Sequence, residues 1–209
     1  MTTNVLIYII IIAVIICVCW RLLSNRVSLP CPAWLGWLVE LDNPIFRDNR
    51  AKVIISHLDI QPGMKILDFG CGPGRLTIPI ARIIGPSSNV TAFDIQEAML
   101  ERVRTKAANE HLGNIETVRG DAGIIKLGTN QYDRALLVTV LGEVPDKKSL
   151  LKEIFNSLKP GGILCVTETI ADPHFQTRKT VQSLASEAGL VAINFFGSRV
   201  SFSMTFRKP

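Results

Sequence analysis

From residue 64 to its C-terminus, the chain alternates short runs rich in β-branched and aromatic residues with longer helical stretches. Such alternation is typical of strand–helix–strand units with right-handed crossovers and a mostly parallel sheet. The predicted strands are 65–69, 89–93, 115–118, 132–140 and 163–167. The predicted helices are 48–58, 75–84, 97–111, 147–158 and 177–188. The pattern therefore predicts an α/β fold with a doubly wound, Rossmann-like sheet.

The C-terminal end departs from this simple alternation. Two further predicted strands, 190–196 and 201–207, are separated by only four residues, which leaves no room for a helix. They are expected to form an antiparallel hairpin at one edge, as the last two of seven strands. The segment 159–162, Lys-Pro-Gly-Gly, is predicted to be a sharp turn, and Gly189 to end the preceding helix.

The N-terminus carries sixteen consecutive apolar residues, 5–20. A helix of that length is about 24 Å long, and the flanking residues extend 1–23 to a workable membrane span. A cleaved signal peptide is the alternative, but the segment has neither a charged start nor a small-residue cleavage site. Arg21 and Arg26 follow it and no basic residue precedes it. The positive-inside tendency therefore predicts a single-pass transmembrane anchor with the domain in the cytoplasm.

Residues 24–44 link this anchor to the domain at 45–209. Trp34 and Trp37 lie there in a short apolar stretch, which predicts either an interfacial helix at the lipid headgroups or a helix that covers the core. The net charge of +5 is dispersed along the chain, so the expected partner is the lipid bilayer and not nucleic acid. The five cysteines lack the spacing of a metal site or a disulfide framework. The sequence leaves the oligomeric state open.

A glycine-rich turn joins the first predicted strand to the next helix. Gly70, Gly72 and Gly74 allow the backbone to turn sharply and to approach a ligand that any Cβ would displace. A dinucleotide fingerprint requires a further glycine at position 75, where this chain has Arg75, and no Walker-type lysine follows. Phosphate-cradle interpretations are therefore disfavoured.

Two acidic residues follow the next two strands. Asp94 ends the second predicted strand, where an acid in a doubly wound sheet accepts hydrogen bonds from ribose hydroxyls. The alternative is an aspartate that caps the following helix. Asp121 follows the third strand and can bond an adenine amino group, or can simply form a turn beside Gly120. All three loops are expected at the carboxyl ends of adjacent strands, where such sheets bind ligands.

Taken in order, these segments resemble the class I S-adenosylmethionine-dependent methyltransferases. The resemblance rests on 68–74 (Asp-Phe-Gly-Cys-Gly-Pro-Gly), Asp94, 120–122 (Gly-Asp-Ala) and 158–162 (Leu-Lys-Pro-Gly-Gly), and covers about 45–209. The most similar branch includes the ubiquinone/menaquinone C-methyltransferases and the membrane-bound thiol methyltransferases. The resemblance implies S-adenosyl-L-methionine as methyl donor, S-adenosyl-L-homocysteine as product, and a seven-stranded sheet whose last strand is inserted antiparallel.

The resemblance also implies roles for individual residues. The glycines at 70, 72 and 74 would line the methionyl part of the donor, Asp94 would hold the ribose, and Asp121 the adenine edge. The side chains that would sandwich the adenine ring are Ile95, Met99 and Ala122. Asp68, Cys71 and Thr139 would complete the cofactor site.

The acceptor side is less well defined. Glu143, after the fourth strand, and His174, after the fifth, are candidates for taking a proton or holding an amine. In the alternative interpretation, Glu143 is a solvent-facing turn residue and His174 is a loop histidine without a catalytic role. Arg47, Arg50 or Arg75 are candidates to pair with the donor's carboxylate. The chain lacks the Asn/Asp-Pro-Pro-aromatic motif of nucleobase-methylating relatives, and 140–146 departs from the Leu-His-His-like segment of the branch.

These features predict a membrane-anchored methyltransferase that acts on a lipophilic small molecule, a lipid headgroup or a thiol. Methyl transfer from a sulfonium depends mainly on orientation of the two reactants. Two alternatives stay open: a membrane-tethered nucleotide-binding module without turnover, and a nicotinamide-dependent oxidoreductase. Arg75 and the C-terminal hairpin argue against the second.

Overall fold

The computed structural model describes residues 8, 36, 40–42, 46–121 and 126–209. Among these residues, no helix is both long enough and apolar enough to cross a bilayer. The predicted anchor at 1–23, apart from residue 8, lies outside the described residues, as do Trp34, Trp37 and Ala122.

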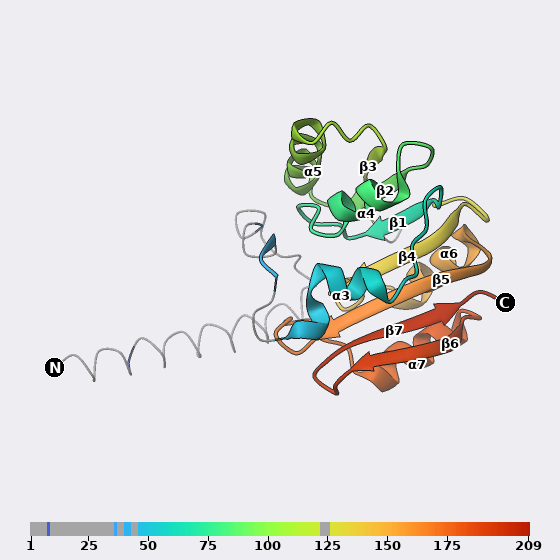
Figure 1. Cartoon of the computed structure of the whole chain (residues 1–209). Coiled ribbons are helices and arrows are strands. Elements are labelled where there is room, and N and C mark those ends of the chain that lie inside the picture. Colours follow the sequence, from blue (N-terminus) through green and yellow to red (C-terminus); the bar gives the residue numbers. More distant parts are fainter. Residues whose placement is uncertain (1–7, 9–35, 37–39, 43–45, 122–125) are drawn as a thin grey trace.

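A single seven-stranded sheet organises the described domain (Figure 1). Its order is β3-β2-β1-β4-β5-β7-β6. The five parallel strands are β1 (Ile66–Phe69), β2 (Val90–Asp94), β3 (Ile115–Arg119), β4 (Tyr132–Val138) and β5 (Leu158–Thr169). The hairpin strands are β6 (Val191–Gly197) and β7 (Ser201–Arg207). The predicted doubly wound sheet with seven strands is therefore confirmed.

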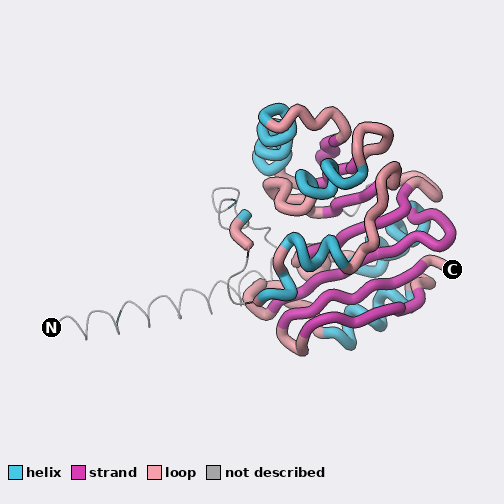
Figure 2. The backbone as a smooth tube through the Cα atoms, in the orientation of Figure 1, coloured by secondary structure: helices cyan, strands magenta, loops and turns pink. Residues whose placement is uncertain are grey.

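Helices pack on both faces of the sheet (Figure 2). One face carries α3 (Ala51–Ser56), α4 (Thr77–Ile84) and α5 (Glu97–Asn109), and the other carries α6 (Lys147–Ser157) and α7 (Arg178–Glu187). Neighbouring residues of β1 show the alternation, since Ile66 packs with α3 and α4 while Leu67 packs with α6 and α7. Both faces of β1 and β2 are buried, as expected for parallel strands between two helical layers.

The C-terminal hairpin takes the predicted form. β7 pairs antiparallel with both β5 and β6, which places β6 at the edge of the sheet. Figure 1 shows β5 ending beside the short helix η2 (Arg47–Asn49), with β7 running in the opposite direction. Gly189 has a φ of 101° and follows α7, as predicted for a C-cap.

Two local predictions are wrong. The expected helix at 48–58 is divided into η2 and α3, because Arg50 has an extended backbone with ψ of 141°. The segment 159–162 is part of β5 and not a separate turn. Its residues bulge between the Tyr132–Leu158 and Arg134–Ile163 pairs, and the backbone N–H of Gly161 donates to the Lys208 carbonyl at 2.9 Å.

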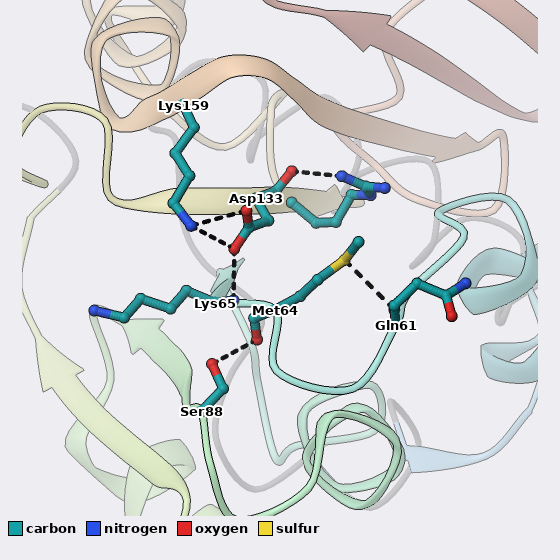
Figure 3. A network of polar contacts seen from close by, with 7 residues as sticks. Gln61, Met64, Lys65, Ser88, Asp133 and Lys159 are labelled. Atoms are coloured by element: carbon teal, nitrogen blue, oxygen red, sulfur yellow. Dashed lines mark hydrogen bonds and ion pairs between the residues drawn. The ribbon is translucent and has the colours of Figure 1, made fainter.

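A polar network ties the amino ends of three strands together (Figure 3). The Asp133 carboxylate in β4 accepts hydrogen bonds from the Lys159 ammonium at 2.8 Å and from the backbone N–H of Lys65, also at 2.8 Å. Burial alone would raise the pKa of Asp133, but the bonds from Lys159 and Lys65 outweigh it, and the pKa lies below its ordinary value. The network therefore favours the ionised carboxylate.

We expect Asp133→Asn to lower the free energy of unfolding by about 1 kcal/mol, because one hydrogen-bonded carboxylate oxygen and the ion pair are lost at a partly exposed site. A lowered pKa contributes stability above the ordinary aspartate range, and this contribution is lost as pH falls through the pKa in the folded protein. Urea unfolding measures the loss in the free energy of unfolding at pH 7, and the same measurement below pH 4 shows how much of the difference between variant and wild type disappears. Equal differences between variant and wild type at the two pH values would contradict this account.

Candidate active site

The carboxyl ends of β1, β2, β4 and β5, with the loops that follow them, form one edge of the sheet, here called the carboxyl rim. The loop after β1 is held by internal hydrogen bonds. The backbone N–H groups of Gly70 and Cys71 both donate to the Phe93 carbonyl, at 2.8 and 2.9 Å. The N–H of Gly72 donates to Asp94 Oδ2 at 2.9 Å, and that of Gly74 to the Cys71 carbonyl at 3.1 Å. These amides are therefore engaged within the protein and do not form an anion cradle.

The glycines of this loop are required by backbone conformation and by protein packing. Gly70, Gly72 and Gly74 have φ of 74°, 52° and 87°. A residue with a side chain would be strained in this region of backbone conformation. A Cβ at Gly70 would lie 2.3 Å from Val140 Cγ2, and one at Gly74 would lie 3.1 Å from Val103 Cγ2. At these two positions the space that a Cβ would take is filled by neighbouring side chains of the protein. That the loop lines the methionyl part of the donor stays a prediction.

Asp68 lies in β1, just before this loop, and is buried. Its Oδ2 accepts a hydrogen bond from the Thr77 hydroxyl at 2.6 Å, at the first residue of α4. Burial raises the pKa of Asp68 to about 6, although the bond from Thr77 and the charge of Arg75 lower it. A carboxylate therefore occupies the N-terminal end of α4, where a dinucleotide-binding fold places a phosphate.

Asp94 links the ends of two strands. Its Oδ2 holds Gly72, and its Oδ1 accepts from the backbone N–H of Gln96 at 2.9 Å, just before α5. Burial raises the pKa of Asp94, while the bonds from Gln96 and Gly72 lower it. Asp94 thus bonds the residue that precedes α5, and among the described residues no side chain caps the first turn of this helix. An ionised carboxylate has about four acceptor positions, so these bonds leave capacity for ribose hydroxyls, and the ribose role stays a prediction.

The remaining predicted cofactor residues differ widely in exposure. The N–H of Gly120 donates to the Asp94 carbonyl at 3.2 Å, which places the exposed Asp121 next in the chain to that contact. Ile95 is 47% exposed, whereas Met99 is 2% exposed within the core side of α5. Their predicted contact with the adenine ring stays a prediction. Cys71 is buried, and burial raises its thiol pKa well above the ordinary value.

Thr139 lies in the carboxyl rim directly after β4 and has a φ of 55°, which is strained for a β-branched residue. Its backbone N–H donates to the Thr167 carbonyl at 2.8 Å, and its hydroxyl to the Val138 carbonyl at 2.7 Å. Strain of this kind concentrates at functional sites, which agrees with the predicted place of Thr139 in the cofactor site.

Arg75 has a structural role. Its guanidinium donates to the Asn49 carbonyl at 2.6 Å and to Asn49 Oδ1 at 3.2 Å, and it pairs with Asp42 at 3.4 Å. The side chain therefore fastens η2 to the glycine loop, and its donors are directed to the protein. Sequence reasoning missed Asn49, which is an unremarkable polar residue in the sequence. Arg47 and Arg50 stay candidates for the donor's carboxylate.

The two predicted acceptor-side residues lie side by side. His174 Nδ1 is 3.9 Å from Glu143 Oε1 and 3.8 Å from Asp172 Oδ1, distances longer than hydrogen bonds. The loops that carry them are in contact, since a Cβ at Gly142 would lie 1.9 Å from the His174 carbonyl oxygen. The sequence placed each of them after its own strand, and the structure brings the two together; a catalytic role stays a prediction.

Sequence reasoning missed one residue of this region. Glu168, near the end of β5, is 1% exposed, and burial raises the pKa of its carboxyl to about 8. The sequence offered only a weak signal, since Glu168 is a charged residue that directly follows the predicted strand 163–167.

The fold and the carboxyl rim together define a Rossmann-like domain of the class I methyltransferase type. Residues 60–193 match the family model described as a methyltransferase domain. The chain belongs to this family of S-adenosylmethionine-dependent methyltransferases.

Individual relatives agree with this assignment. The chain is 37% identical over 133 residues to a demethylmenaquinone methyltransferase of Staphylococcus epidermidis, which covers 64% of this chain and 54% of the relative. A demethylmenaquinone methyltransferase of Staphylococcus aureus is 36% identical over 118 residues, 56% of this chain and 48% of the relative. The chain thus spans about half the length of the curated relatives it matches.

Solved structures share the fold at lower identity. A SAM-dependent methyltransferase from Aquifex aeolicus has a TM-score of 0.75 at 18% identity, and the match covers 86% of this chain and 100% of that one. The [4+2]-cyclase SpnF has a TM-score of 0.69 at 18% identity, with 78% and 81% covered. Because this second neighbour is titled a cyclase, the fold alone does not specify the reaction.

Proposed function

We propose that the protein transfers a methyl group from S-adenosylmethionine to a lipophilic small molecule, a lipid headgroup or a thiol. Family membership supports the donor and the reaction class. The run of sixteen apolar residues at 5–20 supports a lipophilic acceptor, because a membrane-tethered domain meets such molecules at high local concentration. The demethylmenaquinone methyltransferases among the relatives make a demethylated quinol the first acceptor to test.

The observation that carries the choice of donor is the charge of the carboxyl rim. The glycine-loop amides are bonded internally, and the buried carboxyls of Asp68 and Asp94 face this loop from β1 and β2. A diphosphate would meet these two carboxylates, and the N–H groups of Gly70, Cys71, Gly72 and Gly74 are already bonded within the protein. A donor with a sulfonium and an ammonium group would meet complementary charge. The residues present therefore fit S-adenosylmethionine and disfavour a nicotinamide dinucleotide.

The residues of the rim have distinct tasks in this reaction. S-adenosylmethionine supplies an activated methyl group on a positively charged sulfur. Asp94 orders the glycine loop through Gly72 and accepts the ribose hydroxyls. Asp68 provides negative charge near the ammonium group. Glu143 and His174, on the loops after β4 and β5, orient the acceptor and accept its proton, and the packing of these two loops against each other excludes water.

Titration calorimetry with S-adenosylmethionine, followed by methyl transfer assays on vesicle-bound quinols, lipid headgroups and small thiols, tests the proposal. We expect donor binding and transfer to at least one acceptor class, with a faster rate on vesicles. Binding without transfer to any acceptor would support the alternative of a nucleotide-binding module without turnover. Competition by NAD would overturn the choice of donor.

Donor affinity is expected to depend on pH through Asp68. Its pKa of about 6 means that the carboxylate is ionised at pH 7.5 and largely neutral at pH 5. A cationic ligand binds the ionised form better, so the affinity for S-adenosylmethionine should fall about 10-fold between these pH values. Calorimetry at both pH values measures this, and adenosine serves as control, because it lacks the charged methionyl part and its affinity should change little. An affinity that rises on acidification would contradict the role of Asp68.

A further inference from the structure

Glu168 is a buried acid that the proposed function has not used. Alternation along β5 directs Leu164, Val166 and Glu168 to the same face of the sheet, where α6 and α7 pack. Glu168 Oε2 accepts a hydrogen bond from the backbone N–H of Gln176 at 3.0 Å. Its Oε1 is buried and has no hydrogen-bond partner among the described residues. Such an oxygen is costly to bury, which indicates a use beyond folding.

Charged groups surround this carboxyl from two loops and one helix. Glu143 lies in the loop after β4, Asp172 and His174 lie in the loop after β5, and Lys147 begins α6. Lys147 directs its ammonium to the Val144 carbonyl at 2.9 Å. The register partner of Glu168 on β7 is apolar Phe202.

The balance of these charges favours a proton on Glu168. Burial, and then the charges of Asp172 and Glu143, raise the pKa of its carboxyl to about 8, while the bond from Gln176 and the charge of Lys147 lower it. Glu168 therefore carries a proton at neutral pH and can release it at a slightly higher pH, which is the property required of a proton-exchanging group.

One residue connects Glu168 to the acceptor side. The backbone N–H of Gln176 binds Glu168, and its side-chain amide donates to the His174 carbonyl at 2.7 Å. His174 in turn contacts Gly142 and lies beside Glu143 and Asp172. The side-chain exposure increases outward, from 4% at His174 to 15% at Asp172 and 23% at Glu143. The cluster thus extends from the core of the sheet to the carboxyl rim.

We propose that Glu168 is the inner member of a proton-holding cluster, with His174, Asp172 and Glu143, that receives the proton of the methyl acceptor. This inference rests on the proposed function. In the transfer, the bond from sulfur to methyl breaks and its electron pair stays on sulfur, while the acceptor atom bonds the methyl and loses its proton. That proton enters the cluster and leaves to solvent through Glu143, the most exposed member. Glu168 is a positioning residue, because it acts through His174 and not on the reacting atoms.

Glu168→Gln tests the proposal, because glutamine keeps an oxygen for the Gln176 N–H but cannot exchange a proton. The matched control is Glu153→Gln on α6, since Glu153 Oε1 also accepts one backbone N–H, from Leu127 at 2.7 Å. Single-turnover transfer rates are measured from pH 6 to 10 with saturating donor. The wild-type rate is expected to rise with pH around 8. In Glu168→Gln we expect a rate about 10-fold lower at pH 8.5, a flattened pH profile, and an unchanged donor Kd. A wild-type profile in Glu168→Gln would overturn the proposal.

A second measurement does not depend on turnover. Because folding raises the pKa of Glu168, the folded protein binds more protons than the unfolded chain between about pH 4.5 and 8. Wild-type stability should therefore fall as pH rises through this window, and Glu168→Gln should lose that part of the pH dependence while Glu153→Gln keeps it. Equal pH dependence in wild type and Glu168→Gln would show that Glu168 holds no proton and would overturn the inference. If no acceptor is methylated but this pH dependence of stability is observed, the result counts against the proposed function and not against the proton held by Glu168.

Discussion

Gly142→Ala is expected to lower the free energy of unfolding by about 3 kcal/mol and to abolish methyl transfer while donor binding persists. A Cβ at this position would lie 1.9 Å from the His174 carbonyl oxygen and 2.6 Å from His174 Cβ. The obstacle is backbone, so it cannot be relieved by rotating a side chain, and overpacking of this kind costs at the upper end of the usual 1–3 kcal/mol. The loop after β5 must therefore move away from the loop after β4, which separates His174 from Glu143.

The matched control is Gly113→Ala, because a Cβ there meets no atom within 4 Å. Thermal unfolding should show a clear loss for Gly142→Ala and almost none for Gly113→Ala. Calorimetry with S-adenosylmethionine then separates the two sides of the site, since Asp68 and Asp94, the proposed donor-binding residues, lie on β1 and β2. A Gly142→Ala protein that melts like the wild type would show that the two loops are not packed as described.

The elements that could be predicted were those with a strong local signal. The alternation from residue 64 onward predicts the strands, the crossovers and the C-terminal hairpin, because each depends on chain length and periodicity within a short segment. Arg50 shows the limit of this reasoning. Its position between η2 and α3 looks helical in sequence, but its extended backbone places Asn49 against the Arg75 guanidinium. That contact joins residues 26 positions apart and leaves no local pattern.

The candidate site shows the same division. Spacing along the chain predicted that Asp94, Glu143 and His174 would reach one edge of the sheet. It did not predict which partners they find there, because hydrogen bonds such as that from Gly72 to Asp94 depend on how two strands lie in space. Glu168 was missed for a related reason, since its significance comes from burial beside residues of another loop. The sequence pattern predicts at which edge of the sheet a residue lies. Its hydrogen-bond partners and its burial depend on three-dimensional packing.

Asp94 should affect both folding and donor binding, because its carboxylate orders the backbone and is also the predicted ribose acceptor. Its two oxygens accept from Gly72 and from Gln96, each at 2.9 Å. Asparagine has a single side-chain oxygen, so Asp94→Asn leaves one of these N–H groups facing an amide NH₂. We expect a loss of about 1–2 kcal/mol in the free energy of unfolding, reduced by relief from burying a charge.

The same substitution should weaken S-adenosylmethionine binding about 100-fold. Hydrogen bonds to a charged acceptor contribute about 1.5–3 kcal/mol each, and tenfold in affinity corresponds to about 1.4 kcal/mol, so loss of the bonds to the ribose hydroxyls accounts for this factor. Calorimetry at a temperature where the variant is fully folded measures it.

Asp133→Asn separates the ligand effect from the folding effect. Asp133 is also an aspartate that accepts a backbone N–H from a neighbouring strand, but it lies at the amino ends of the strands (Figure 3). Both variants should lose stability, and only Asp94→Asn should lose donor affinity. If the two variants bind S-adenosylmethionine equally well, Asp94 is a structural link between the glycine loop and α5, and the donor's ribose must be held elsewhere. If Asp94→Asn alone binds weakly, the carboxylate that orders the loop also holds the ligand, and the cost of burying it is explained by function.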